Sequence, residues 1–147
     1  MLGLAQAAQD ATKTVAKLAE EDSRVAKLEQ MREDAEETER RTLVLVDGFE
    51  GKKTKIRELG RETKAEASEM MNTYLGDDAD ELDGFEFLTM AEAGELGHWE
   101  IVREMSRKLG EREALELAQW SVPIQQRHTQ IVRECSLELA AEEAVEA

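Results

Sequence analysis

The fold is indicated most clearly by residues 87–110, which read FLTMAEAGELGHWEIVREMSRKLG. Apolar residues recur here at helical spacing, and they form one face that consists of Phe87, Leu88, Ala91, Val102, Met105 and Leu109. Gly110 stands where a helix commonly ends, because glycine adopts the left-handed conformation that closes the last turn. The stretch therefore predicts a long amphipathic helix over roughly residues 79–109.

Similar amphipathic stretches flank this one along the chain. They predict helices over about residues 2–21, 22–46 and 112–143, and a shorter, more polar helix over about residues 53–74. Short connections between long helices make successive helices antiparallel neighbours. The sequence therefore predicts an all-α fold in a single domain over residues 1–147. We expect an antiparallel four-helix bundle with an additional shorter helix between the second and third long helices.

The composition excludes several classes of partner. The 147 residues include 34 acidic and 19 basic ones, for a net charge of −15. Such a surface repels a phosphate backbone, so we expect no nucleic-acid partner. No apolar run approaches the length of a membrane span, and the first residues lack the basic region of a signal peptide. The single cysteine, Cys135, excludes an internal disulfide and is expected in the core. We therefore expect a cytoplasmic protein with no membrane partner.

Two histidines are expected inside the bundle. His98 and Glu95 lie about one turn apart, within the apolar face of the 79–109 helix. His128 lies in the middle of the apolar face of the last helix, and Gln125 precedes it by three residues. A buried ionised carboxylate without a partner is unfavourable by several kcal/mol at least. These residues therefore predict an interior site for a cation.

Two other interpretations of the same residues stay open. Each histidine can be a buried neutral side chain that is hydrogen-bonded to a neighbouring side chain or carbonyl. The partner of Glu95 can be an arginine, and Arg41 and Arg127 are the candidates.

Several short motifs carry a resemblance to a known family. Glu-x-x-His from two facing helices, with one Glu from each of the other two, is the ligand set of di-iron and di-manganese carboxylate bundles. Residues 95–98 match one such motif, and Gln125 replaces the acid of the second. Residues 34–38, Asp-Ala-Glu-Glu-Thr, are similar to a His-x-x-Glu-Thr signature, and residues 98–101 to a His-Tyr-Glu-Ile run. The chain thus resembles the ferritin-like superfamily, and most closely the YciE/YciF-type stress-associated ferritin-like proteins.

The resemblance implies a function and a set of ligands. It implies iron or manganese at an interior site, with metal-centred redox chemistry, such as ferrous oxidation or peroxide handling, in stress protection. The candidate ligands are Glu37, Glu95, His98, Gln125 and His128. Because few of these are both interior and charged, we expect one weakly held ion rather than a dinuclear centre.

The alternative function is non-catalytic, so the sequence leaves open whether the protein is an enzyme. In this interpretation the metal site is degenerate and the helical bundle acts through homo-oligomerisation or another protein–protein contact. We expect a homodimer, for which Met70, Met71 and Tyr74 of the 53–74 helix are candidate interface residues.

Overall fold

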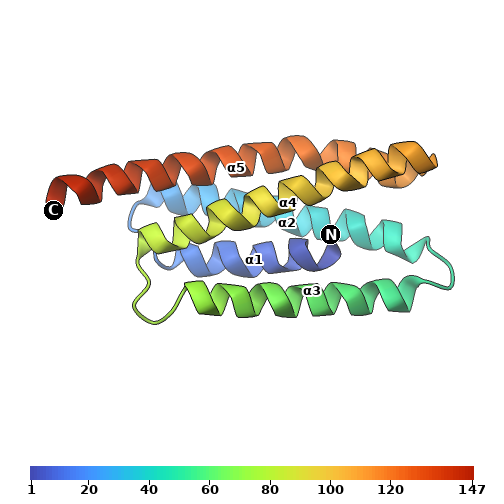
Figure 1. Cartoon of the computed structure of the whole chain (residues 1–147), viewed down its shortest axis with the longest axis horizontal. Helices are drawn as coiled ribbons and strands as arrows, with labels where there is room; N and C mark the ends of the chain where they lie inside the picture. Colours follow the sequence, from blue (N-terminus) through green and yellow to red (C-terminus); the bar gives the residue numbers. More distant parts are fainter.

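The computed structural model describes residues 1–147 and contains five α-helices and no strand. The helices are α1 (Leu2–Ala16), α2 (Asp22–Asp47), α3 (Lys53–Tyr74), α4 (Glu81–Leu109) and α5 (Arg112–Glu146). Consecutive helices run in opposite directions along the long axis of the molecule (Figure 1). None of them combines the length and the apolar character that crossing a membrane requires. The all-α prediction is confirmed.

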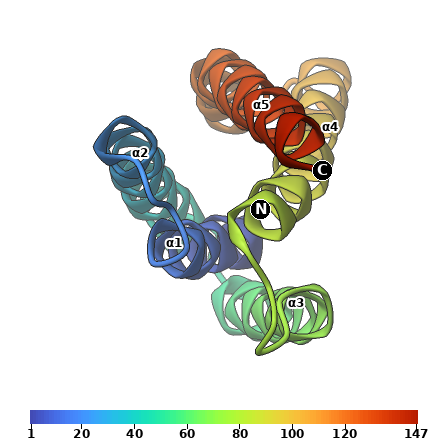
Figure 2. The same cartoon turned by 90° about the vertical axis from the view of Figure 1, so that its left-hand side faces the viewer.

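The helices pack as two hairpins and one outer helix. α4 packs mainly on α5, α1 packs mainly on α2, and the hairpins meet through α1 with α4 and α2 with α5. α3 lies outside, against α1 (Figure 2), and Gly60 is its one buried residue. At this crossing the backbones approach so closely that a Cβ on Gly3 would lie 2.2 Å from the carbonyl oxygen of Gly60. The polar character of α3 follows from its peripheral position.

The length of α1 differs from the prediction, which placed its end near residue 21, whereas α3 has the predicted bounds. α1 has 15 residues and ends at Ala16, whereas α3 has 22 residues, so the helix expected to be shorter is the longer of the two. No glycine or proline marks the end of α1 in the sequence. The chain leaves the helix through a tighter turn, in which the N–H of Leu18 donates to the carbonyl of Val15 at 2.9 Å. Leu18 then lies against Gly84 of α4, a tertiary contact that local sequence does not encode.

Local chemistry sets both ends of α4. The side chain of Asp80 accepts a hydrogen bond from the N–H of Asp83 at 2.9 Å, and the side chain of Asp83 accepts one from the N–H of Asp80 at 3.0 Å. This reciprocal cap satisfies two N–H groups that the first turn leaves without partners. At the other end Gly110 has a φ of +70°, which only glycine adopts without strain. The predicted glycine end of this helix is confirmed.

A buried arginine ties three helices together at one end of the molecule. Arg24 of α2 is 3% exposed, and its guanidinium lies 3.2 Å from Glu81 of α4 and 3.1 Å from Glu142 of α5. Removing one partner of such a buried pair would leave an unpaired charge in the interior. The network therefore fixes α2 relative to the α4–α5 hairpin.

The core consists of two apolar clusters. The larger one contains Ala11, Val15, Leu28, Met31, Phe85, Phe87, Leu88, Val132, Cys135 and Leu139, so the expected burial of the cysteine is confirmed. The smaller one contains Trp99, Leu117, Ala118 and Val122. On both α4 and α5, the buried residues between these two clusters are polar: Glu92 and Glu95 on one helix, Gln125 and His128 on the other. Polar side chains thus separate the two parts of the core.

Candidate functional site

Five side chains from three helices form the polar part of the interior, which we call the polar layer. Its members are Asp34 of α2, Glu92 and Glu95 of α4, and Gln125 and His128 of α5. The last four are 1–4% exposed, and the side chain of Asp34 is 16% exposed. An ionised group at such depth is strongly unfavourable without a partner. The contacts of each side chain therefore determine what the polar layer can do.

His128 links the three helices. Its Nε2 lies 2.8 Å from Oδ2 of Asp34, and its Nδ1 lies 3.4 Å from Oε2 of Glu92. Burial alone lowers the pKa of this imidazole, but the carboxylates of Glu92 and Asp34 more than offset that effect. The pKa of His128 is therefore raised above its ordinary value, and the ring, when protonated, forms ion pairs with both carboxylates.

Asp34 lies at the outer edge of the polar layer. Besides His128, it accepts hydrogen bonds from Arg127 at 3.2 Å and from the side-chain amide of Gln30 at 3.1 Å. Partial burial raises the pKa of Asp34, but these donors together hold it below its ordinary value. Asp34 is thus ionised at neutral pH and stabilises the protonated form of His128.

Unlike Asp34, Glu95 accepts no hydrogen bond from a histidine or arginine side chain. Burial, and then repulsion from Glu92, raise the pKa of Glu95 to about 8, although the α-amino group of Met1 acts in the opposite direction. At neutral pH the side chain is therefore mostly a neutral carboxylic acid. Glu95 therefore holds a proton that a bound metal cation would have to displace.

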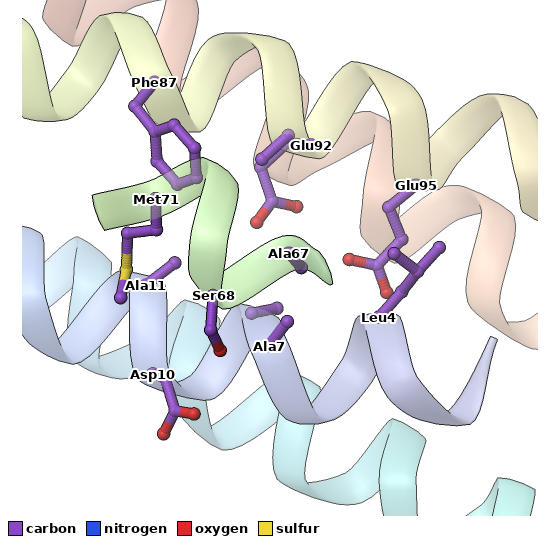
Figure 3. Close-up of a pocket in the computed structure, with 12 residues that line it drawn as sticks. Leu4, Ala7, Asp10, Ala11, Ala67, Ser68, Met71, Phe87, Glu92 and Glu95 are labelled. Atoms are coloured by element: carbon purple, nitrogen blue, oxygen red, sulfur yellow. The ribbon is translucent and has the colours of Figure 1, made fainter. Parts of the chain in front are cut away.

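Both glutamates of the polar layer have a buried oxygen that is poorly paired. Oε1 of Glu95 reaches no hydrogen-bond partner, and the only contact of Oε2 of Glu92 is the 3.4 Å ion pair with Nδ1 of His128. The two side chains line a cavity of about 50 Å³ between α1, α3 and α4, whose remaining wall is mostly apolar (Figure 3). A single water needs roughly 10–15 Å³ of such space, so the cavity has room for a small ion and water. Asp10 also lines the cavity, but its carboxylate points away from both glutamates and lies 3.6 Å from Lys64.

His98 is not part of the polar layer. It is exposed, and its Nδ1 lies 2.7 Å from the carbonyl oxygen of Gly94 on the outer side of α4. The prediction that both histidines share an interior site is therefore wrong. The apolar face assigned from the sequence included Met105 and Leu109, which are 57% and 71% exposed. The face that is buried is rotated away from them and contains Leu88, Glu92, Glu95 and Trp99.

Glu37 also lies outside the polar layer. Its carboxylate accepts hydrogen bonds from Arg40 and Arg41 on the surface of α2, and these two arginines lower the pKa of Glu37 to about 2. The guanidinium of Arg41 also lies 4.0 Å from the ring centre of Trp120. Because Arg41 is bound in this way and Arg127 contacts Asp34, neither arginine forms the ion pair with Glu95 that was one of the open interpretations.

The sequence placed three members of the polar layer correctly and missed two. Glu95, Gln125 and His128 are buried as predicted. Glu92 was missed although a signal exists, because Leu88, Glu92, Glu95 and Trp99 follow one another at spacings of four, three and four. Asp34 was missed as well, although it lies three residues after Met31 and four before Thr38, both of which are buried. Its role depends on the contact between α2 and α5, which joins residues 94 positions apart.

The polar layer does not fit the dinuclear centre of the ferritin-like family. No group of three or more His, Cys, Asp and Glu side chains is arranged to hold a metal ion. Asp34 and Glu92 contact different nitrogens of His128, so these three groups cannot converge on one ion. The second Glu-x-x-His motif has the neutral Gln125 in place of its acid.

Gly94, Gly97 and Trp99 lie close to Glu95 on α4. A Cβ on either glycine would meet no atom within 4 Å. Trp99 is fully buried, and its indole N–H lies in the interior without a hydrogen-bond partner. It sits one turn from Glu95, so its fluorescence is suited to report on that carboxyl group.

Comparison of the chain with protein-family models, with curated proteins and with solved structures finds no match.

Proposed function

We propose that the protein binds one divalent cation, manganese or ferrous iron, between Glu92 and Glu95. The observation that supports this proposal is the pair of buried carboxyl groups on one helix beside the same cavity, with Oε1 of Glu95 unpaired and Oε2 of Glu92 held only by a 3.4 Å contact with His128. A buried acceptor without a partner is unfavourable by about 1–3 kcal/mol, and more when it is charged. A cation that satisfies both oxygens would recover this free energy on binding.

The chemistry of the donors favours a hard cation. Carboxylate oxygens and water suit Mn²⁺, and such ions are often held by only one or two carboxylates with water completing the coordination. Gln125 adds a neutral buried oxygen without a hydrogen-bond partner in the same layer. In this proposal His128 is a positioning residue, because Asp34 holds its ring and the ring in turn holds Glu92. We further propose that α1, α2, α4 and α5 form a ferritin-like four-helix bundle around this layer.

Binding in this site competes with a proton. Because the pKa of Glu95 is about 8, a cation that binds at pH 7 must displace the proton of this side chain. The apparent affinity should therefore rise about tenfold per pH unit below pH 8 and level off above it. A surface site made of ordinary carboxylates would show no change over this range.

Titration with Mn²⁺ tests the proposal. Free Mn²⁺ is measured from the electron paramagnetic resonance signal of its aqua ion, at pH 7 and at pH 8.5. We expect one equivalent bound to the wild-type protein, more tightly at the higher pH. Glu95→Gln should abolish this binding while preserving the shape of the side chain, and Glu37→Gln should leave it unchanged. Absence of binding at pH 8.5, or equal binding by Glu95→Gln, would contradict the proposal.

A second candidate function is assembly without metal chemistry. The observation that favours it is the number of large apolar side chains on the surface. On α3, Met70 and Tyr74 are 56% and 55% exposed, whereas Met71 packs partly against the larger apolar cluster. This function needs no cation, so Glu95→Gln would preserve it. Measuring self-association of that variant in parallel with Mn²⁺ binding separates the two functions.

A further inference from the structure

We propose that the outer face of α4 binds a second copy of the chain, with the two α4 helices antiparallel and a two-fold axis between Gly97 and His98. This inference does not rest on the cation site, because the outer face points away from the polar layer.

The face is a continuous stripe without a partner in the monomer, which we call the outer stripe. Its residues are Met90, Gly94, Gly97, Ile101 and Met105, and their spacing of three or four places them on one side of the helix. The three large side chains are 49%, 57% and 57% exposed. α4 has α1 and α5 as neighbours and a free outer side (Figure 2). Exposed apolar side chains that cluster on one face mark a site of interaction.

The two glycines of the outer stripe have no function within the monomer. Each destabilises the interior of a helix by about 1 kcal/mol relative to alanine. Gly3 and Gly84 are explained by close contacts, since a Cβ there would lie 2.2 Å from a backbone oxygen or 2.9 Å from Val15. A Cβ on Gly94 or Gly97 would meet no atom within 4 Å. A second helix that approaches closely at this point accounts for both of them.

The outer stripe is symmetric about its own centre. Met90 and Met105 lie equally far from the midpoint between Gly97 and His98, and so do Gly94 and Ile101. A two-fold interface is self-complementary, because each contact of residue i with residue j is repeated as j with i. With two antiparallel helices in this register, Met90 meets Met105 of the second copy. Ile101 of each copy lies over Gly94 of the other, so a large side chain fills the space left by a glycine.

The charges of α4 favour the antiparallel orientation. Residues 77–102 include no lysine or arginine, and exposed acids gather at the N-terminal end: Asp77, Asp78, Asp80, Asp83 and Glu86. The three basic residues of the helix, Arg103, Arg107 and Lys108, are exposed near its C-terminal end; Glu100 and Glu104 are exposed there too, and Arg107 pairs with Glu104, which leaves a small positive excess. Antiparallel pairing places each acidic end beside the basic end of the second copy, with Glu86 near Lys108. Parallel pairing would place like charges together.

Sedimentation equilibrium of the full chain and its variants tests this inference. We expect a reversible dimer whose dissociation constant rises at least about 30-fold in Ile101→Glu, because a charge would be buried at the centre of the interface. Leu137→Glu is the matched control, since Leu137 on α5 is 60% exposed. It should leave the dimer unchanged. A chain that stays monomeric up to about 1 mM, or a dimer that Leu137→Glu disrupts and Ile101→Glu does not, would overturn the proposal.

A charge exchange tests the register, and restored association in a mixture of two variants would show that each variant still folds. Glu86→Lys and Lys108→Glu should each weaken the dimer, because each places like charges in both symmetry-related pairs. A mixture of the two variants should form a heterodimer of wild-type affinity, since every pair in it joins opposite charges. Failure of the mixture to associate better than either variant alone would overturn the antiparallel register.

Discussion

The carboxyl group of Glu95 makes the stability of the protein depend on pH. Its pKa rises from an ordinary 4.5 to about 8 in the folded chain, so the folded state binds this proton more tightly than the unfolded state. The stabilising contribution is complete below about pH 4.5 and is lost as the pH rises through about 8. The raised pKa of His128 acts in the same direction.

We therefore predict that the free energy of unfolding falls between pH 6 and pH 9. In Glu95→Gln the fall should be smaller, by an amount on the order of a few kcal/mol, because the neutral amide cannot ionise. Urea denaturation at the two pH values measures this difference. Glu37→Gln is the control, since the pKa of Glu37 is about 2 and lies far below this range. Parallel declines in wild type and Glu95→Gln would contradict the assignment of the buried proton.

Asp34 is predicted to hold the proton of His128. Asp34→Asn removes the charge that lies 2.8 Å from the ring, so the pKa of His128 should fall. Destabilisation of about 1–3 kcal/mol should follow, and it should be greater at pH 6 than at pH 9. Nuclear magnetic resonance titration of the imidazoles gives the pKa directly. The chain has only two histidines, and the exposed His98 serves as an internal reference. An unchanged titration of His128 in the variant would exclude this role.

At the scale of the helix, residues 125–128 of α5 match Glu-x-x-His except that Gln125 replaces the glutamate. Gln125 is 1% exposed, precedes His128 by three residues and has an unpaired oxygen. We predict that Gln125→Glu strengthens Mn²⁺ binding, because it adds a negative charge to the polar layer and restores Glu-x-x-His. The same charge should destabilise the metal-free protein. Thermal melts with and without Mn²⁺ measure both effects, and a variant that Mn²⁺ fails to stabilise more than wild type would refute the prediction.

The glycines of α1 and α4 should respond to substitution in opposite directions. Gly3→Ala forces α1 and α3 apart, because its Cβ would lie 2.2 Å from a backbone oxygen, and should destabilise the protein by about 1–3 kcal/mol. Gly94→Ala meets no atom within the monomer and should stabilise it by up to about 1 kcal/mol. Urea denaturation of dilute protein compares the two. The same Gly94→Ala substitution should weaken the proposed dimer. A variant that stabilised the monomer and also strengthened the dimer would argue against the outer stripe as the interface.

For the molecule as a whole, the sequence predicted the helices better than their faces. The bounds of α3 and the glycine end of α4 were predicted because breakers and a cap mark them locally. The end of α1 was not, since it depends on Leu18 reaching Gly84 on a distant helix. The buried face of α4 was misassigned because apolar residues occur on both of its sides. Met90, Ile101 and Met105 form the outer stripe, and Leu88 and Trp99 lie in the core.

The same difficulty explains which parts of the site were predicted. A histidine and a glutamine inside one clear apolar face, as on α5, are located by periodicity alone. On α4, apolar residues occur on two sides of the helix. The buried face was therefore misassigned, so that His98 was expected in the interior and Glu92 was not. Asp34 joins the polar layer through the packing of α2 on α5, which a single sequence does not reveal. Tertiary packing therefore selects the members of the site from a larger set of polar residues.

Anomalous diffraction tests the central claim, one cation between Glu92 and Glu95, most directly. Crystals grown at pH 8.5 with Mn²⁺ would be measured at the manganese absorption edge, where only the metal gives a strong signal. We predict a single interior peak within about 2.2 Å of a carboxylate oxygen of each glutamate. No interior peak, a peak only at surface carboxylates such as Glu37, or two adjacent interior peaks would contradict the account.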